Sequence, residues 1–578
     1  MVRTKRRETP EPLTLTLSQR ERELARRDFL RLGAAALVGL PMAMAACGAS
    51  TAAPGSSAGS GISAAKPSAP PRAQLPTYVP VQGPKPDLPG TKDIDPGYFS
   101  FPKNNLFQSV KNAPGKGGDV TVTTWTLVAP PAPFDQNPAW QAVNKAVNAN
   151  LKVNVVPFAD YNTKFAALTA GGDIPDILYV AAPTIEGLPD FLRASCVDLA
   201  PYVSGDAIKG YPNLANIPSS AWKSAANFYG GIYGVPVPFP PFFWIFWVHQ
   251  DMLDQAGLQQ PGSADDWLRG LKELTKPSAG QFGLGTETNG GYGVTVGLQP
   301  SIFGAPNNWK VDPGGKLVRS IETAEYKAAL GYARDMYSAG VYDPNSATYN
   351  TISARADFMA RKFAFRFDGW QSASVSFWDS AQSDPTKKYR VVKPFPAKAG
   401  DKASYFFGPG IFGFSVIKKA SSDRVKEVLR IMDYMAAPFG SQEHLLLHYG
   451  VQDTDYKFDD NGNPVLTPKG KADAMPWQYI TAPPGALYYA PNPKDYAQVL
   501  QDAEKEMFAA GVADPTVGLY SPANASKGTV LNQKFNDGIN DIVTGRTPLT
   551  TFDQLVLDWK ANGGDQIRTE FQALLPGQ

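Results

Sequence analysis

From Asp119 onward, the sequence alternates between short strand-like segments and helical segments. Residues 119–125 (DVTVTTW) alternate like a strand, 139–151 have helical spacing, and 152–158 (KVNVVPF) read as a second strand. A further helix, a Gly-Gly stop and a third strand follow over 161–180. Strands that alternate with helices predict βαβ units and parallel sheets, so we expect an α/β fold.

Later segments carry clear helix signals. Ser263 is placed to act as an N-cap, with Asp266 in the capping-box position three residues on. Thr323 and Gly340 are expected to begin and end a second helix. The sequence therefore predicts three helices over 263–276, 323–340 and 421–438.

The first 46 residues have the features of an export signal. Arg26–Arg27 precede an apolar run, 32–46, which at about 15 residues is too short to span a membrane. The string RRDFLR is similar to the twin-arginine export pattern, and MAAC is similar to a lipobox. We expect lipid on Cys47 and an extracytoplasmic protein anchored to the cell membrane. The alternative is ordinary cleavage, with no lipid on Cys47.

Residues 47–118 are rich in Pro, Gly, Ser and Ala and have no apolar period. Such a segment cannot bury enough apolar surface to offset the entropy of ordering it. The composition therefore predicts a tether between the membrane anchor and a folded body.

Charge and cysteine content exclude several classes of protein. Nine Lys/Arg and five Asp/Glu in residues 1–46 contribute +4 to a formal net charge of +2, which leaves −2 for the rest. That value gives no electrostatic signature of nucleic-acid binding. If Cys47 carries lipid, Cys196 has no partner for an internal disulfide, and we interpret it as a buried, unreactive thiol.

The order of segments over roughly 400 residues resembles a known family. The matching pieces are TVTTW, GGDIPDIL, YGVP, FWVHQDMLDQAGL, ETAEYKAALGYARDMYSAGVYDP, MARKFAFRFDGW and IFGFSVIKKASSDRVKEVLRIMDYM. In this order, behind a lipoprotein-type leader, they resemble the family 1 extracellular solute-binding proteins of bacterial ABC importers. The pattern is most similar to the aldouronate- and alginate-type oligosaccharide-binding lipoproteins.

The resemblance implies a two-lobed, type II periplasmic-binding-protein-like fold, in which each lobe has a mainly parallel sheet flanked by helices. Hinge strands would join the lobes and allow closure on a ligand. We expect lobe 1 to comprise 119–235 and 411–475, and lobe 2 to comprise 236–410 and 476–578. The crossings between lobes are expected at 233–236, near 408–410 and somewhere within 465–480.

Aromatic side chains near strand ends, loops and crossings are the candidate ligand contacts, because a sugar stacks its C–H faces on aromatic rings. Trp125 ends the first strand. Trp370 follows the strand 363–369, where the resemblance implies a stacking tryptophan. The full set of expected ligand-binding residues is Trp125, Thr184, Phe239, Phe242, Trp309, Trp370, Tyr405 and Trp477.

The resemblance implies a monomeric binding protein that captures a carbohydrate, expected to be an oligosaccharide, and delivers it to the transmembrane subunits of an ABC transporter. We expect no enzymatic activity, since the chain has no phosphate loop or CxxC pair, and its GxSxG string, GSSAG at 55–59, stands in the segment rich in Pro, Gly, Ser and Ala, where a nucleophile elbow is not expected. The alternatives are a secreted carbohydrate-active lyase or hydrolase and a binding protein for a non-sugar cargo such as a peptide. An acidic sugar would require basic residues in the cleft, for which Arg355, Arg361 and Arg366 are placed suitably.

No cofactor is expected. His444 and His448 are four residues apart, but the residue after His444 is Leu, so the pair lacks the HExxH glutamate. The acidic segment 453–460 departs from EF-hand spacing. Some alginate-type relatives bind calcium, so a calcium site here is an alternative, but DDNGNPV at 459–465 favours a hairpin turn.

Overall fold

The computed structural model describes the ranges 73–91, 93–181, 185–225, 231–242, 244–285, 292–484, 487–489 and 495–575. Cys47 and Thr184 lie outside these ranges. Residues 69–578 form one compact unit, within which two sheets with separate cores define two lobes.

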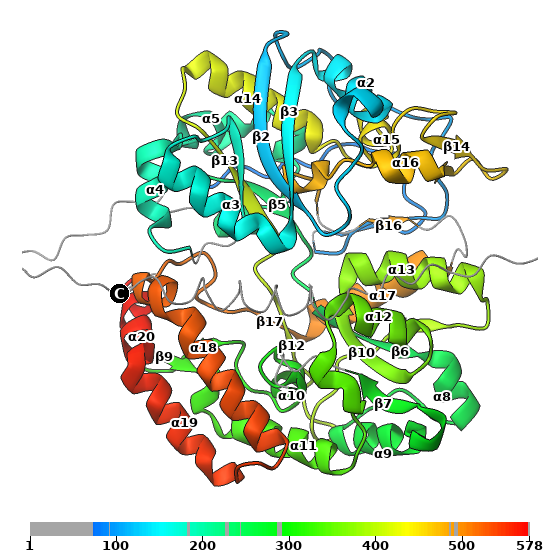
Figure 1. Ribbon diagram of the computed structural model, residues 1–578, viewed down its shortest axis with the longest axis vertical. Helices are drawn as coiled ribbons and strands as arrows, with labels where there is room; N and C mark the ends of the chain where they lie inside the picture. The colour runs from blue at the N-terminus through cyan, green and yellow to red at the C-terminus, as the bar shows by residue number, and fades with distance from the viewer. Residues whose placement is uncertain are drawn as a thin grey trace, which may run out of the picture. The chain divides into compact units, whose positions relative to one another are not determined.

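The sheet of lobe 1 has five strands (Figure 1, upper half). Their order is β3 (Asn150–Pro157), β2 (Asp119–Thr126), β4 (Ile177–Val180), β13 (Ile411–Ile417) and β5 (Val235–Pro238). β2 runs parallel to β3 and β4, whereas β13 runs antiparallel to β4 and β5. The α/β class and the mainly parallel sheet are confirmed: β3, β2, β4 and β5 run in one direction, and β13 runs in the opposite direction. The reason is that β13 enters lobe 1 from lobe 2.

Helices pack on both faces of this sheet and share one core with it, in which Val120, Leu178 and Val428 are fully buried. The helices of lobe 1 are α2 (Pro138–Val147), α3 (Phe158–Gly171), α4 (Leu188–Ser195), α5 (Ala200–Val203), α6 (Pro212–Ala215), α7 (Ser219–Ser224), α14 (Ser422–Met435), α15 (Gln442–Tyr449) and α16 (Pro468–Asp473). A hairpin of β14 (Tyr456–Phe458) and β15 (Pro464–Leu466) precedes α16, as the turn sequence predicts.

The sheet of lobe 2 has the order β11 (Tyr389–Val391), β6 (Trp244–His249), β10 (Phe363–Gly369) and β7 (Phe282–Gly285). Here too the pairing is mixed, since β6 runs antiparallel to both of its neighbours. Side chains of β6 alternate between two cores: Ile245 and Trp247 lie in one, and Phe246 and Val248 lie in the other.

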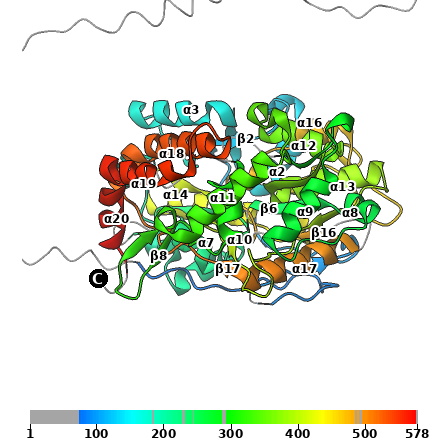
Figure 2. The same cartoon turned by 90° about the horizontal axis from the view of Figure 1, so that it is seen from below.

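Helices surround this second sheet. They are α8 (Gln250–Ala256), α9 (Ala264–Leu274), α10 (Leu298–Ile302), α11 (Ala324–Ser338), α12 (Thr351–Met359), α13 (Trp370–Ser383), α17 (Asp495–Ala510), α18 (Pro522–Val543), α19 (Phe552–Trp559) and α20 (Asp565–Gln572). Figure 2 shows α18, α19 and α20 on one side of the lobe and α8, α9 and α13 on the other. The predicted caps are confirmed: Ser263 Oγ accepts from Asp266 N, and Thr323 Oγ1 accepts from Tyr326 N.

Two crossings between the lobes are hydrogen-bonded to each other. Phe239 N donates to the carbonyl of Gly410 at 3.0 Å, and Gly408 N donates to the carbonyl of Pro241 at 2.6 Å. The second crossing therefore falls where the sequence places it, near 408–410. The first lies after β5, a few residues beyond the expected 233–236, because 235–238 form an edge strand of the lobe 1 sheet.

The third crossing lies later than expected. Trp477 and Ile480 belong to the core of lobe 1, whereas Tyr488 belongs to a core of lobe 2. Lobe 1 therefore extends beyond the expected boundary at 475, and Tyr488 already belongs to lobe 2. Tyr488–Tyr489 form β16, which pairs in parallel with β1 (Gly97–Tyr98).

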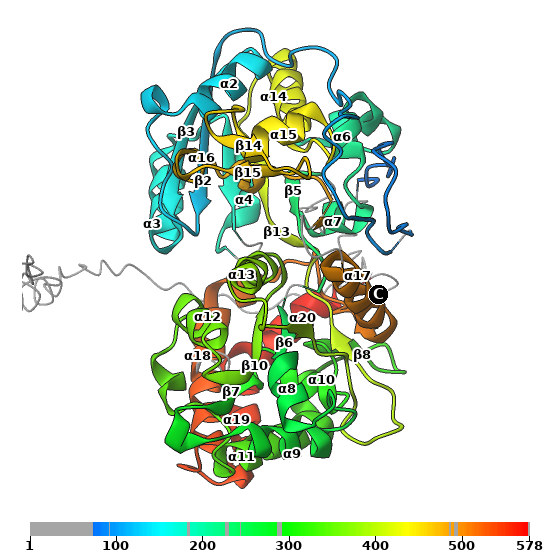
Figure 3. The same ribbon diagram turned by 90° about the vertical axis from the view of Figure 1, so that its right-hand side faces the viewer.

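Residues 73–118, expected to form part of a tether, pack against both lobes. Val79 N donates to Ala215 O on lobe 1, and Gly115 N donates to Val147 O. Between these points, Gln501 Nε2 on α17 of lobe 2 donates to the carbonyl of Asp95 at 3.0 Å. Figure 3 shows the start of this segment beside α6 and α7. The prediction of a tether is therefore wrong for residues 73–118. A proline-rich segment without a core of its own can still be ordered by hydrogen bonds to a folded neighbour.

Candidate functional site

A cavity of about 500 Å³ lies between the lobes, beside the two hydrogen-bonded crossings. Lobe 1 contributes residues from the ends of β4 and α7 and the start of β13. Lobe 2 contributes α18, α20 and the loops around 308 and 514–521. Phe239, Pro240, Pro409 and Gly410 of the crossings line it as well. A molecule bound here would therefore touch both lobes and both crossings.

The wall on the lobe 1 side is aromatic. Phe239 and Phe412 line the cavity, with ring centroids 5.3 Å apart. Behind them, Trp125 stacks on Phe412, with ring centroids 5.2 Å apart and an interplanar angle of 7°. The ring centroid of Tyr479 lies 4.6 Å from that of Trp125. This row of rings offers an apolar, flat surface of the kind that stacks on a sugar ring.

Local sequence explains why Phe412 faces the cavity. Tyr179 OH donates to the carbonyl of Phe412 at 2.8 Å, which holds the backbone at this point. A Cβ at Gly413 would lie 2.3 Å from the Tyr179 hydroxyl, so only glycine allows the tyrosine to cross there. Gly413 thus permits the contact that fixes Phe412 at the start of β13.

The wall on the lobe 2 side is polar. Asn308, Arg319, Asp514, Asn524 and Asn532 line it. Asn308 has a left-handed backbone (φ 52°), a conformation that asparagine tolerates, and its Nδ2 donates to Asp514 Oδ2 at 3.1 Å. Burial raises the pKa of Asp514, although donors from Thr516 and Asn308 oppose that shift. Amide, guanidinium and carboxyl groups of this kind recognise hydroxyl groups by hydrogen bonding.

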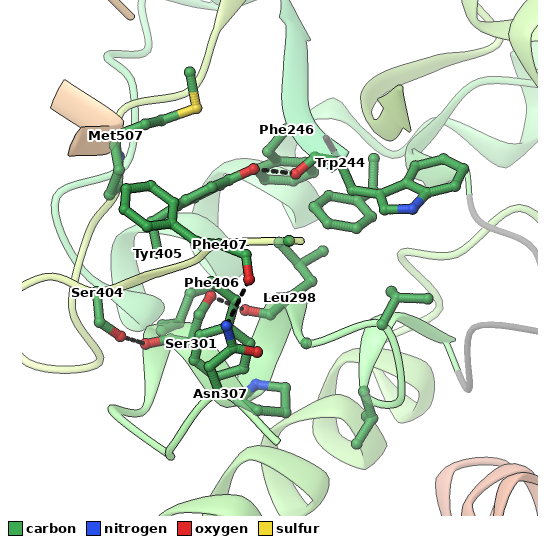
Figure 4. Close-up of a pocket in the computed structure, with 18 of the residues that line it drawn as sticks. Trp244, Phe246, Leu298, Ser301, Asn307, Ser404, Tyr405, Phe406, Phe407 and Met507 are labelled. Carbon is green, nitrogen blue, oxygen red and sulfur yellow. Dashed lines mark hydrogen bonds between the residues drawn. The ribbon is translucent and has the colours of Figure 1, made fainter. Parts of the chain in front are cut away.

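A second cavity of about 270 Å³ lies within lobe 2, and Asn308 lines both cavities. Figure 4 shows its labelled walls and the hydrogen bonds that fix them. Asn307 Nδ2 donates to Phe407 O at 2.7 Å, and the Tyr405 hydroxyl donates to the carbonyl of Trp244. Trp244, at the first position of β6, is 38% exposed. This cavity therefore adds an accessible indole to the site.

Three of the expected ligand contacts lie at these cavities. Phe239 and Trp309 line the cavity between the lobes, and Tyr405 lines the cavity within lobe 2. Trp309 is only 3% exposed and packs against Arg319, so it supports the polar wall more than it offers a free face. Thr184 lies outside the described residues.

Four expected contacts must be corrected, because their side chains lie in cores. Trp370 is 2% exposed and packs edge-on against Phe242 at 5.0 Å, so neither ring can stack on a solute in this structure. Trp477 is buried in the core of lobe 1. Trp125 is buried behind Phe412 and does not line the cavity itself. In each case burial by residues distant in sequence decides the outcome.

The three arginines considered for an acidic ligand are engaged elsewhere. Arg355 and Arg366 both pair with Asp368, at 2.7 and 2.8 Å. Burial would raise the pKa of Asp368, but the two guanidinium groups hold it below its ordinary value. Arg361 pairs with Asp251 at 2.8 Å. These arginines stabilise lobe 2 instead of lining the cavities.

Other candidate chemistry has structural explanations. Burial raises the pKa of the Cys196 thiol to about 12, in agreement with an unreactive cysteine. In the hairpin, Asp459 Oδ1 accepts from Asn461 N and Asn463 N, so this carboxylate closes the turn. No group of three or more His, Cys, Asp or Glu placed to hold a metal ion is found in the described ranges.

Sequence reasoning missed Phe412, Trp244 and the polar wall. Phe412 follows the crossing at 408–410 by two residues, and that proximity was a usable signal. Trp244 stands in a dense aromatic run, 242–247, and the sequence does not distinguish the residue that opens the strand from those in the core. The residues of the polar wall come from two segments, 308–319 and 514–532, and no local pattern joins them.

Two α/β lobes, hydrogen-bonded crossings and a cavity between the lobes define a two-lobed binding protein. Comparison with known proteins gives the family: a model of the bacterial extracellular solute-binding protein matches residues 128–439, more than half of the chain, and the chain belongs to this family. No helix in the described part of the chain has the length and apolar character required to cross a membrane.

Individual relatives are distant but cover most of the chain. Lipoprotein LipO of Bacillus subtilis (strain 168) is 23% identical over 78% of this chain and 90% of its own. The polygalacturonan/rhamnogalacturonan-binding protein YtcQ of the same organism is 24% identical over 75% and 87%. An HMO-binding, ABC-transporter-associated solute-binding protein from Bifidobacterium longum infantis ATCC 15697 has the same fold, with a TM-score of 0.59, 14% identity and coverage of 79% and 98%.

Proposed function

We propose that this protein captures an oligosaccharide between its lobes and delivers it to the transmembrane subunits of an ABC importer. The observation that carries the proposal is the pairing of an aromatic wall on lobe 1, Phe239 and Phe412, with a polar wall on lobe 2. A sugar has apolar C–H faces and a rim of hydroxyl groups, and each wall suits one of them.

The relatives support a carbohydrate as the solute. The name of one Bacillus subtilis relative specifies polygalacturonan/rhamnogalacturonan binding, and that of the Bifidobacterium structure specifies HMO binding. A peptide cargo is the alternative. Peptide binding commonly uses backbone hydrogen bonding along a strand edge, whereas the residues that line this cavity include aromatic and amide side chains suited to a sugar, such as those of Phe412, Asn524 and Asn532.

The proposal assigns no catalytic activity and no cofactor to the chain. Hydrolysis of a glycosidic bond by the usual route needs two carboxyl groups about 5–10 Å apart across the bond. Asp514 is the only carboxylate among the described residues that line the two cavities. A search for new reducing ends or unsaturated products after incubation with polysaccharides tests this part directly; either product would support the alternative of a secreted lyase or hydrolase.

We further propose that the protein acts as a monomer outside the cytoplasm, held to the membrane by lipid on Cys47. The leader sequence supports this, as does the lipoprotein name of one relative. Replacement of Cys47 by Ala should release the protein from the membrane fraction without changing its affinity for solute. Retention of the Cys47→Ala protein on membranes would contradict the lipid anchor.

Thermal melting and calorimetric titration of the full chain against neutral and acidic oligosaccharides test the binding proposal. A ligand that binds the folded state raises its stability by mass action, by about 2.7 kcal/mol at a concentration 100 times Kd. We expect at least one oligosaccharide to raise the melting temperature and to titrate with a defined stoichiometry. An unchanged melting temperature across the panel would contradict the proposal.

A further inference from the structure

Arg319 differs from the other arginines that pair with acidic side chains. It ends β9 (Leu317–Arg319) and lines the cavity between the lobes. In the described part of the chain, no carboxylate oxygen lies within 4.0 Å of its guanidinium nitrogens. Its Nε is buried and has no hydrogen-bond partner. By contrast, carboxylate partners are present at Arg355, Arg361, Arg366, Arg424 and Arg568.

The nearest acidic groups are already occupied. Glu322, three residues along, forms ion pairs with Arg568 at 2.8 Å and Lys560 at 2.6 Å. Asp514 accepts hydrogen bonds on both oxygens, from Thr516 on one and from Asn308 on the other. The positive charge of Arg319 is therefore not neutralised by direct pairing with a described carboxylate.

Two indoles fix the position of this guanidinium. Its central carbon lies 5.3 Å from the ring centroid of Trp309 and 4.6 Å from that of Trp559. Cation–π contacts of this kind hold an arginine in place without using its hydrogen-bond donors. Burial lowers the pKa of Arg319 from its ordinary value, although the charges of Asp514 and Glu322 partly oppose that shift.

A held guanidinium with unused donors, beside a cavity, has a specific chemical preference. Its planar fork of N–H groups matches the two oxygens of a carboxylate. A neutral hydroxyl can also accept from it but leaves the charge uncompensated. We propose that Arg319 binds a carboxylate of the solute and that the cargo is an oligosaccharide carrying uronic acid residues. This inference rests on the proposed function.

The neighbouring residues fit an acidic sugar bound in this orientation. Asn524 and Asn532 line the same cavity as Arg319, so their amides are available to hydroxyl groups of a sugar whose carboxylate is bound at Arg319. The apolar face of the ring can then lie toward Phe412 on the opposite wall. One arginine thus supplies the charge recognition, and the remaining side chains supply contacts that neutral and acidic sugars share.

Calorimetric titration of the full chain with a trimer of galacturonate, its methyl ester, and matched glucuronate and neutral oligosaccharides tests the proposal. Esterification keeps the sugar and removes the negative charge. We expect an acidic oligosaccharide to bind at least about tenfold more tightly than its ester, because hydrogen bonds to a charged group are among the stronger ones. Arg319→Gln should abolish that difference.

Two controls separate this proposal from simpler explanations. Arg269→Gln, at an exposed arginine of α9, should leave the acid-to-ester ratio unchanged. Arg319→Gln without ligand should melt only slightly below the unmodified protein, since it loses the two cation–π contacts but no direct ion pair with a described carboxylate. A large drop in melting temperature would show that Arg319 is a structural residue and would overturn the proposal.

Failure of the inference is distinguishable from failure of the proposed function. Equal affinity for acid and ester, or tight binding of neutral oligosaccharides that Arg319→Gln does not change, would overturn the role of Arg319 and leave oligosaccharide binding intact. Absence of binding by every member of both series would contradict the proposed function and the inference together.

Discussion

The indole of Trp125 lies parallel to the phenyl ring of Phe412, with centroids 5.2 Å apart and an interplanar angle of 7°. Only Phe412 lines the cavity between the lobes, so the two rings have different roles. Phe412→Ala should weaken solute binding by roughly 0.5–1.5 kcal/mol beyond the loss of contact area, because the stacking surface is removed. Trp125→Ala should mainly lower the stability of lobe 1. Titration calorimetry and denaturant unfolding of both variants check this division, and loss of stability without loss of affinity in Phe412→Ala would contradict it.

Trp244 and Trp370 form a second contrasting pair. Trp244 is 38% exposed beside the cavity of lobe 2, and Trp370 is 2% exposed in a core. We expect Trp370→Ala to cost about 3–5 kcal/mol in unfolding free energy, as large-to-small substitutions in cores do. Trp244→Ala should cost little stability but reduce both affinity and the change in tryptophan emission on ligand binding. Loss of affinity in Trp370→Ala, together with unchanged affinity in Trp244→Ala, would support the sequence-based assignment of Trp370 to the site.

Asp433 makes the stability of lobe 1 dependent on pH. Its carboxylate is buried and accepts from Asn213 N at 2.8 Å and Leu214 N at 2.9 Å. Burial raises its pKa to about 7. Between about pH 4 and pH 7 the folded protein therefore binds a proton that the unfolded chain does not, so the contribution to stability falls as pH rises through this window.

Asp433→Asn tests that dependence, since asparagine keeps an oxygen acceptor for both amides. We expect the variant to be more stable than the unmodified protein above pH 7, by up to about 4 kcal/mol. Its unfolding free energy should also vary less between pH 4 and pH 7. Urea unfolding at several pH values measures both quantities; equal pH dependence in the two proteins would refute the assignment.

The N-terminal segment 73–118 should depend on Gln501 for its attachment to lobe 2. Gln501 is buried, and its Nε2 donates to Pro89 O at 3.2 Å and Asp95 O at 3.0 Å. Gln501→Ala should cost about 0.5–1.5 kcal/mol for each hydrogen bond lost, because the carbonyl groups of Pro89 and Asp95 lose their donor. Amide hydrogen exchange should increase around residues 88–97. Gln498→Ala on the same helix, whose partner Asp502 is exposed, is the matched control and should change neither quantity.

Local sequence patterns predicted the secondary structure well. Alternation along β6 separates Ile245 and Trp247 from Phe246 and Val248, as a period of two requires. The caps at Ser263 and Thr323 were readable because they depend on residues three positions apart. The crossing at 408–410 could be located because glycine and proline interrupt the pattern there.

The site was predicted less well, because exposure is a tertiary property. Trp370 follows a strand at the expected place, yet Phe242 and Tyr488, from distant segments, enclose it. Arg319 and Asn532 lie more than 200 residues apart and meet at one cavity only because β9 and α18 pack in the same lobe. The segment 73–118 is ordered by contacts with α17, which composition cannot indicate.

The central claim is that the solute is held between the two lobes. The most direct test is calorimetric titration of an oligosaccharide that binds the full chain against two variants, Phe412→Ala on the lobe 1 wall and Asn532→Ala on the lobe 2 wall. We predict that each substitution weakens binding of the same oligosaccharide while the melting temperature of the free protein changes little. Unchanged affinity in both variants would contradict a site between the lobes.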